Sequence, residues 1–313
     1  MINRKSATIS VVIPTYNRKG YVERCVQSVI DQSYKNVEII VCDNASSDGS
    51  PKILRNLLEK SGRPFKLVEH VENIGPYRNW VSGVEIAKGE AIKVLFSDDF
   101  LEPDCLEIQS RELFEEHSDC GFVISGALEI DEETGADLEV YCGEPTRIGL
   151  EEFAMGMGLR VPHLPYTLST ALIRKGVLID NVNAVADMSS NAVERAIGPD
   201  VIMLYGGVSR SIDGYRGGSC LVKMAPAKDS ITLNSRSLIL KDCYEEAFEL
   251  ILKQASPYWL RRFQMARLMR FLIDPKRQRS VLPWKRVKKY CKLRTIREMG
   301  FVLRSILRMH RLS

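Results

Sequence analysis

The 313-residue sequence contains no run of about 18 apolar residues, so no segment is expected to cross a bilayer as a helix. Its first ten residues are polar and lack an apolar stretch, so we predict no secretory signal. The eight cysteines are scattered singly without a Cys-x-x-Cys pair, which argues against a disulfide framework or a zinc cluster. We expect most of them to be small core residues in a reducing cytoplasm.

The composition that remains is typical of a folded globular protein, with 45% hydrophobic and 27% charged residues. The net charge of +4 hides an uneven distribution. Residues 276–313 hold 13 Lys and Arg against one acid, a charge of +12, so the other residues together carry −8. A basic segment of this kind suits an anionic membrane or nucleic acid, and it also fits a solvated helix face.

The first half of the chain alternates short apolar runs with amphipathic stretches. Strands are predicted at 9–13, 37–42, 65–69, 91–96 and 121–130, with helices at 20–33, from 50 to the glycine at 62, 77–88 and 103–117. This order predicts an α/β fold with a mostly parallel central sheet flanked by helices. Ligands of such sheets bind beyond the carboxyl ends of the strands.

The second half has weaker patterns. Residues 149–158 fit a loop or a short helix, 167–173 a strand, and 187–196 and 200–206 helices. The glycine-rich stretch Gly214–Ser219 indicates a flexible turn, and from Leu238 onward the pattern is mainly helical.

Three carboxylates follow predicted strands. Asp43 ends the second strand, and Asp98 and Asp99 end the fourth, so a parallel sheet places them at one edge. Two adjacent carboxylates repel unless a cation or hydrogen-bond donors offset their charge. Oxygen ligands suit Mg²⁺ or Mn²⁺, although Asp98 and Asp99 on their own would equally cap the following turn.

Four stretches occur in this order with short spacings: VVIPTYNRKGYVERCVQSVIDQSY, VCDNASSDGS, ENIGPYRNW and VLFSDDFLEPD. Together they closely resemble the amino-terminal half of family 2 glycosyltransferases, which have the GT-A fold. The resemblance covers about residues 8–130 and continues more weakly to about 220. It implies a GT-A domain at 1–225, with a nucleotide-binding half at 8–130 and an acceptor and catalytic half at 131–225. A helical basic region would then occupy 226–313.

The resemblance also implies a donor site for a nucleotide-sugar. The residues that would line its nucleotide pocket are Pro14, Thr15, Tyr16, Asn17 and Arg18, with the Tyr16 ring on the base.

Other residues would complete the donor site. Asp43 would accept a hydrogen bond from a uracil-type imide. Contacts to base and phosphate would come from Asn73, Gly75, Arg78 and Asn79. In the family's Asp-x-Asp-like motif, Ser97 replaces the first acid, Asp98 would hold the ribose, and Asp99 would bind Mn²⁺ or Mg²⁺.

Inverting transfer needs a carboxylate that takes the proton from the acceptor hydroxyl. The family position for this base matches Asp200 in AIGPDVIML, where Pro199 replaces the family's preceding Glu; Asp187 and Glu194 are rivals. His163 could line the acceptor cleft. Arg216 would be the cation of a flexible stretch that closes over the donor diphosphate.

The predicted function is therefore transfer of one sugar from a nucleotide-diphosphate sugar, UDP favoured, to a glycan or lipid-linked acceptor in bacterial surface polysaccharide synthesis. We expect a cytoplasmic protein with peripheral contact of its basic helices at the inner face of the plasma membrane. A GT-A scaffold that binds nucleotide-sugars without transfer is the alternative. Nucleic-acid binding is not expected because no recognisable module is present. A nucleotidyltransferase would need a glycine-rich loop where PTYNR stands. A processive synthase would need membrane spans and a Gln-x-x-Arg-Trp signature.

Overall fold

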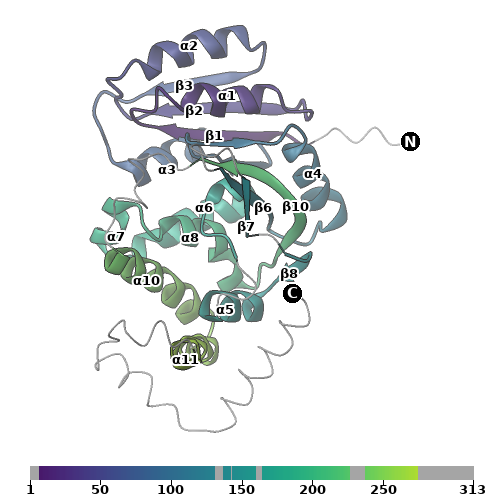
Figure 1. Cartoon of the computed structure of the whole chain (residues 1–313), viewed down its shortest axis with the longest axis vertical. Coiled ribbons are helices and arrows are strands. Elements are labelled where there is room, and N and C mark those ends of the chain that lie inside the picture. Colours follow the sequence, from purple (N-terminus) through teal and green to yellow (C-terminus); the bar gives the residue numbers. More distant parts are fainter. Residues whose placement is uncertain (1–6, 131–136, 142, 160–163, 226–236, 274–313) are drawn as a thin grey trace.

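The structure, a computed structural model, describes residues 7–130, 137–141, 143–159, 164–225 and 237–273 (Figure 1). The basic segment 276–313 and His163 lie outside the described residues. Across the described ranges the strands form one ten-stranded sheet, with a main path in the order β3-β2-β1-β4-β9-β6-β10-β5. The strand β7 pairs with β6 beside this path, and β8 pairs with β10.

One half of the sheet is parallel, as the sequence predicts. Its strands are β3 (Phe65–Glu69), β2 (Val37–Asp43), β1 (Ile9–Thr15) and β4 (Ala91–Val94). Successive side chains of β1 point to opposite faces. Val11 packs with α1 (Val22–Ile30) and α2 (Ser50–Lys60), whereas Val12 packs with α3 (Pro76–Ile86), so helices cover both faces of this half (Figure 1).

The other half of the sheet is mixed, with both parallel and antiparallel pairs. The strand β9 (Ala171–Arg174) runs antiparallel to both β4 and β6 (Phe122–Ile130). Beyond it, β10 (Gly214–Met224) is parallel to β6. The remaining strands are all antiparallel to their partners: β5 (Asp99–Leu101) and β8 (Thr146–Ile148) pair with β10, and β7 (Asp137–Val140) with β6.

The predicted flexible turn at Gly214–Ser219 is wrong, because these residues belong to β10. Its glycines permit close packing instead of a turn. A Cβ atom at Gly214 would lie 2.2 Å from the ring of Phe122, and one at Gly217 would lie 2.3 Å from Oε1 of Glu112.

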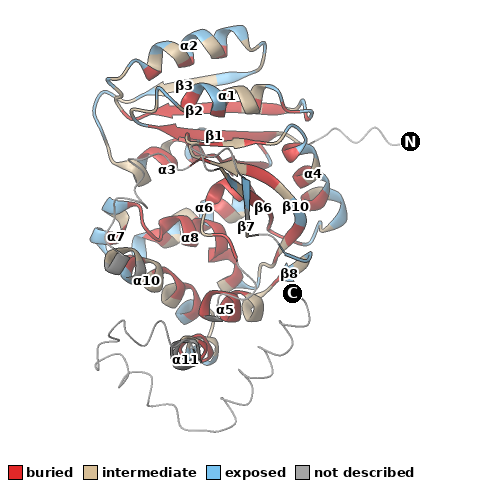
Figure 2. Cartoon of the chain, viewed as in Figure 1, coloured by how far each residue is buried: buried red, intermediate tan, exposed pale blue. Residues whose placement is uncertain are grey.

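Of the remaining described helices, the first lies beside the sheet near β1 and the others lie lower in Figure 1. They are α4 (Cys105–Arg111, continued by a π-helical turn at Glu112–Glu116), α5 (Leu150–Leu159), α6 (Lys175–Ala184), α7 (Ser190–Arg195), α8 (Pro199–Tyr205), α10 (Ser237–Ala255) and α11 (Pro257–Ile273). Of the loop and the short helix predicted for residues 149–158, the structure has the helix, as α5. Phe153 of α5 lies 5.2 Å from Tyr205 of α8 and 6.3 Å from Phe248 of α10, between ring centroids. The helices α10 and α11 therefore share a hydrophobic core with the sheet domain (Figure 2).

Five cysteines are free and buried, as expected: Cys25, Cys42, Cys105, Cys120 and Cys243. Cys220 is disulfide-bonded, which the scattered cysteine pattern did not predict. Among the described residues, no helix combines the length and the apolar character that crossing a membrane requires.

Candidate active site

The carboxyl ends of three parallel strands meet at one edge of the sheet. Thr15 is paired with Asp43 across β1 and β2, and Val12 with Val94 across β1 and β4. Past β4, the backbone N–H of Leu95 still donates to the carbonyl of Val12, at 2.9 Å. The segment that follows brings Ser97 and Asp98 to the edge where Asp43 ends its strand, as the sequence predicts.

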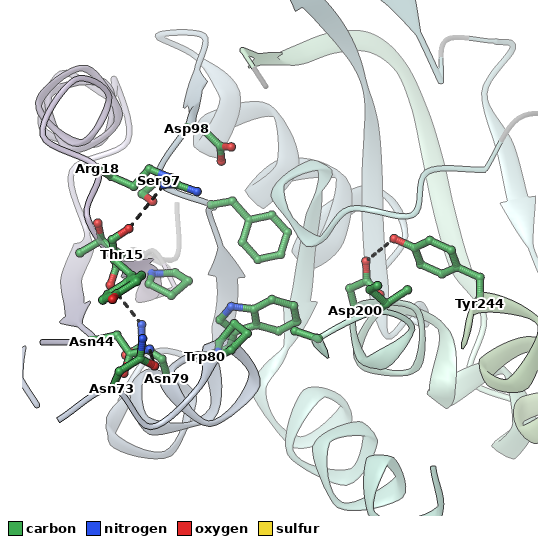
Figure 3. Close-up of a pocket in the computed structure, with 16 residues that line it drawn as sticks. Thr15, Arg18, Asn44, Asn73, Asn79, Trp80, Ser97, Asp98, Asp200 and Tyr244 are labelled. Atoms are coloured by element: carbon green, nitrogen blue, oxygen red, sulfur yellow. Dashed lines mark hydrogen bonds between the residues drawn. The ribbon is translucent and has the colours of Figure 1, made fainter. Parts of the chain in front are cut away.

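A cavity of about 470 Å³ opens at this edge (Figure 3). Most of its lining comes from the strand ends and α3, and the remainder from the chain around α8 and from α10. The lining residues are Pro14, Thr15, Tyr16, Arg18, Asn44, Asn73, Pro76, Asn79, Trp80, Phe96, Ser97, Asp98, Ala196, Ile197, Asp200 and Tyr244. Nine of the proposed site residues are among them: Pro14, Thr15, Tyr16, Arg18, Asn73, Asn79, Ser97, Asp98 and Asp200. The six others, which do not line this cavity, are Asn17, Asp43, Gly75, Arg78, Asp99 and Arg216.

One end of the cavity is built by two neighbouring loops. Asn44 donates from its amide to Oδ1 of Asn73, at 2.9 Å, and its own Oδ1 accepts from the N–H of Ile74. Asn17 connects the loop after β1 to the loop after β2, because its Oδ1 accepts a hydrogen bond from the N–H of Ser47 at 2.9 Å. Asn17 therefore shapes this end of the cavity without lining it.

Tyr16 also lines the cavity, and 44% of its surface is exposed. An exposed aromatic face of this kind can pack on a planar base. Arg18 lines the cavity as well (Figure 3), and its guanidinium supplies a cation that suits phosphate.

Buried polar atoms without partners gather just behind this wall. They are Oγ1 of Thr15, Oδ1 of Asp43 and Oδ1 of Asn79. The second carboxylate oxygen of Asp43 accepts from the N–H of Ser46, at 2.9 Å. Unsatisfied buried polar atoms are rare in folded proteins, and their clustering marks a place where a bound group could complete the hydrogen bonding.

The two adjacent acids have different surroundings. Asp98 lines the cavity, whereas Asp99 is only 7% exposed and is hydrogen-bonded to Ser169. The hydroxyl oxygen of Ser169 also accepts a hydrogen bond from the N–H of Phe96, at 3.1 Å. Ser169 therefore contacts both ends of the segment from Phe96 to Asp99. Burial, followed by the charge of Asp98, raises the pKa of Asp99 to about 8. Asp98 therefore lines the cavity and Asp99 does not, while the metal-binding role of Asp99 stays a prediction.

The described residues contain no cluster of three or more acid, His or Cys side chains that could hold a metal by itself. Asp98 alone still fits Mg²⁺ or Mn²⁺, because these ions commonly take one or two carboxylates and complete their shell with substrate phosphates.

An aromatic pair separates the two ends of the cavity. The rings of Trp80 and Phe96 are 5.0 Å apart between centroids, and Figure 3 shows Trp80 between the loops on one side and Asp200 on the other. This wall is apolar, so it can cover the less polar face of a sugar.

Asp200 marks the far end. Its Oδ1 accepts from the N–H groups of Gly198 and Val201, each at 3.0 Å, and its Oδ2 accepts from the Tyr244 hydroxyl at 3.3 Å. Burial raises the pKa of Asp200 to about 7, from the usual 3.8, and the three hydrogen bonds hold back part of that rise. A carboxylate with a pKa near neutrality is suited to general base catalysis.

The rival bases do not line this cavity. Asp187 accepts a hydrogen bond from Gln254, at 3.1 Å, and Glu194 faces a separate cavity. Arg216 is buried in β10, where its guanidinium donates to the carbonyl oxygen of Glu144 at 2.6 Å. Arg216 does not reach the cavity, so the expected closure over the diphosphate has no support in this arrangement.

The sequence did not indicate seven residues of the lining: Asn44, Pro76, Trp80, Phe96, Ala196, Ile197 and Tyr244. All of them except Tyr244 stand inside the quoted stretches, close to predicted site residues, and this proximity is the signal that could have indicated them. Tyr244 lies in a helix far along the chain with no motif around it, so nothing in its local sequence could have indicated it.

A sheet whose parallel half presents Arg18 and Asp98 at its carboxyl edge, opposite a buried basic carboxylate, has the architecture of the GT-A class of nucleotide-sugar enzymes. The chain belongs to glycosyl transferase family 2, whose model matches residues 10–178. This confirms the family that the sequence motifs resemble.

Solved structures confirm the fold. S. aureus TarS 1–349 in complex with UDP-GlcNAc superposes with a TM-score of 0.63 at 15% identity, over 97% of this chain and 83% of that one. A mannosyltransferase from Pyrobaculum calidifontis, in complex with GDP-Man and Mn²⁺, gives a TM-score of 0.52 at 15% identity, over 87% and 77%. At these identities the likeness shows the GT-A fold alone.

Curated relatives are more similar in sequence over shorter stretches. Glycosyltransferase GlyG of Streptococcus pneumoniae is 34% identical over 131 residues, which are 42% of this chain and 42% of the relative. Abequosyltransferase RfbV of Salmonella typhimurium is 37% identical over 102 residues, which are 32% of this chain and 31% of the relative. The chain therefore matches less than half the length of these relatives.

Proposed function

We propose that the protein transfers a single sugar, with inversion, from a nucleotide-diphosphate sugar to a glycan or lipid-linked glycan of a bacterial surface polysaccharide. One observation carries the proposal: a single cavity holds Arg18 and Asp98 toward one end and a carboxylate with a pKa of about 7 at the other. The UDP-GlcNAc complex of the TarS neighbour supports the choice of a UDP-sugar.

The donor would lie along the strand ends. Tyr16 packs on the base, Arg18 offsets diphosphate charge, and the paired loops around Asn44 and Asn73 shape the pocket. Asp98 would hold Mn²⁺ or Mg²⁺, which when bound stabilises the negative charge of the leaving diphosphate. The Trp80 and Phe96 rings give the transferred sugar an apolar wall.

Asp200 would take the proton from the acceptor hydroxyl as that oxygen attacks the anomeric carbon. Its raised pKa makes it basic enough at neutral pH, and the fixed N–H donors of Gly198 and Val201 orient the carboxylate. Tyr244 donates to the other oxygen and so adjusts the basicity of the group.

The test is a screen of nucleotide-sugars for Mn²⁺-dependent hydrolysis and transfer, run with the wild type and with Asp200→Asn. We expect the substitution to lower transfer by about 100- to 10,000-fold, the usual contribution of a general base. Binding of UDP should stay unchanged. Retained transfer by Asp200→Asn would show that the base is another group. Binding of UDP by a wild type that turns over no donor and acceptor pair would favour the alternative, a nucleotide-sugar-binding scaffold.

We also propose that the protein works at the cytoplasmic face of the plasma membrane. The support is the charge of +12 on residues 276–313, a segment that lies outside the described residues. Failure of the protein to bind vesicles that contain anionic lipid, at low salt, would contradict this part of the proposal.

A further inference from the structure

A second cavity, of about 570 Å³, lies beside the first. Its walls are the start of α3, the end of α6 with the turn that follows, and α7. Gly75 and Arg78, which the sequence motif assigns to the donor, line this second cavity instead of the first.

The lining combines an apolar floor with polar side chains at the mouth. Val185 and Met188 are buried in the floor. The ring of Tyr77 is fixed there, because its hydroxyl donates to the carbonyl of Val182 at 3.1 Å. A fixed aromatic ring over an apolar floor is a surface on which a sugar ring can lie.

Four polar side chains complete the lining: Arg78, Asn183, Ser190 and Glu194. Within the described part of the chain, none of their side chains forms a hydrogen bond or an ion pair, although Arg78 and Glu194 carry opposite charges. The cavity thus offers both hydrogen-bond donors and hydrogen-bond acceptors around an apolar floor. This combination matches the hydroxyl groups of an oligosaccharide better than it matches a purely apolar or a purely charged ligand.

The two cavities adjoin each other. Pro76 lines both of them. Glu194 lines the second, and the left-handed turn at Ala196, with a φ of 51°, ends α7 and leads to residues that line the first beside Asp200. A chain seated in the second cavity would therefore lie next to the residues that line the first cavity beside the proposed base.

We infer that the second cavity binds the acceptor glycan, holding the sugar units that precede the one whose hydroxyl faces Asp200. This inference rests on the proposed function and deepens it. Arg78 and Glu194 are then acceptor-binding residues, and Arg78 is not a contact of the donor phosphate.

The experiment measures binding, so that it does not depend on turnover. The probes are mono- to tetrasaccharides of glucose, galactose and N-acetylglucosamine. Their binding to the UDP-loaded full-length chain is followed by saturation-transfer NMR, in the Asp200→Asn background. The double variant Arg78→Ala/Glu194→Ala is compared with Arg111→Ala/Glu116→Ala, which removes an exposed ion pair outside both cavities. The four targeted side chains are largely exposed, so folding should be preserved.

We expect oligosaccharides to bind more tightly than monosaccharides in the parent. The double variant should lose about tenfold or more in oligosaccharide affinity, since each charge-assisted hydrogen bond contributes that order. Affinity for UDP should remain within about twofold, and the control should match the parent. A tenfold loss of UDP affinity would overturn the inference and assign the cavity to the donor. Unchanged oligosaccharide affinity, or no length-dependent binding by the parent, would overturn it as well. Loss of transfer in Asp200→Asn would support the proposed base, and oligosaccharide binding retained by the same variant would support the acceptor cavity independently.

Discussion

The Tyr244 hydroxyl donates a hydrogen bond of 3.3 Å to Oδ2 of Asp200, across 44 positions of the sequence. It connects helix α10 to the first turn of α8, where the proposed base lies. The hydrogen bond stabilises the ionised carboxylate, so it lowers the pKa of Asp200 against the opposing effect of burial.

Replacement of Tyr244 by Phe should therefore raise the pKa of Asp200 further. A smaller share of the enzyme would then carry the ionised base at neutral pH. The ascending limb of kcat against pH should move to higher pH, with a several-fold loss of rate near pH 6 that recovers in alkaline buffer.

Tyr166→Phe is the matched control, because the Tyr166 ring stacks on Tyr244 at 5.4 Å while its hydroxyl has no hydrogen bond to Asp200. Superimposable pH profiles for Tyr244→Phe and the wild type would show that the hydrogen bond does not tune the base.

Asp200→Asn should stabilise the fold at alkaline pH. The pKa of Asp200 is about 7 in the folded state and near 3.8 in the unfolded chain, so the folded state binds more protons between these values. The free energy of unfolding contributed by this group is present below pH 4 and is lost as the pH rises through 7. Asparagine keeps an acceptor for the N–H groups of Gly198 and Val201 without the charge.

Urea denaturation at pH 5 and pH 8 measures this effect. We expect the variant to gain stability relative to the wild type at pH 8, on the order of a few kcal/mol at most, and little at pH 5. An equal effect at both pH values would mean that Asp200 is not buried in its ionised form.

The two adjacent acids should respond differently to substitution. Asp98→Asn should abolish the Mn²⁺ dependence of UDP binding, because Asp98 lines the cavity. Asp99→Asn should retain it, since Asp99 is buried against Ser169. Calorimetric titration of UDP with and without Mn²⁺, or after removal of metal with a chelator, measures the difference.

Ser97→Ala serves as the control and should change little. The reverse outcome, with metal dependence lost in Asp99→Asn and kept in Asp98→Asn, would restore the assignment made from the sequence.

Asn44→Ala should loosen the nucleotide end of the cavity. The side chain holds Asn73 and the N–H of Ile74 with two hydrogen bonds of 2.9 Å. Their loss should cost about 1–3 kcal/mol of stability and weaken UDP binding about tenfold.

Asn36→Ala removes a comparable amide hydrogen bond, to Thr8, near the opposite end of β1. Thermal unfolding and UDP titration of both variants separate the effects: an equal loss of UDP affinity in Asn36→Ala would mean that the Asn44 effect is one of general stability.

The parallel half of the fold could be predicted from the sequence because its signals are local. The apolar runs at 9–13 and 37–42 lie within the observed strands β1 and β2, and the rule for parallel sheets correctly placed Asp43 and Asp98 at one edge. The mixed half depends on pairing between distant segments, and no local pattern states that β9 inserts between β4 and β6.

The glycines of β10 show the same limit. Gly214 and Gly217 have the composition of a turn, yet they are there because the Phe122 ring and the Glu112 carboxylate approach too closely for any side chain. The sequence also could not show which of Asp98 and Asp99 is buried, because two adjacent residues of the same type give no indication of which one faces the cavity.

The cavity walls come from both ends of the described chain, from Pro14 to Tyr244. During synthesis, the strands that would bind the donor leave the ribosome long before α10 does. A nascent chain can therefore form a nucleotide pocket early, while the proposed base gains its tyrosine only when α10 has docked. A proteolytic product that ends before α10 would keep much of the nucleotide-binding surface and lack a tuned catalytic group, so it would compete for nucleotide-sugar without using it productively.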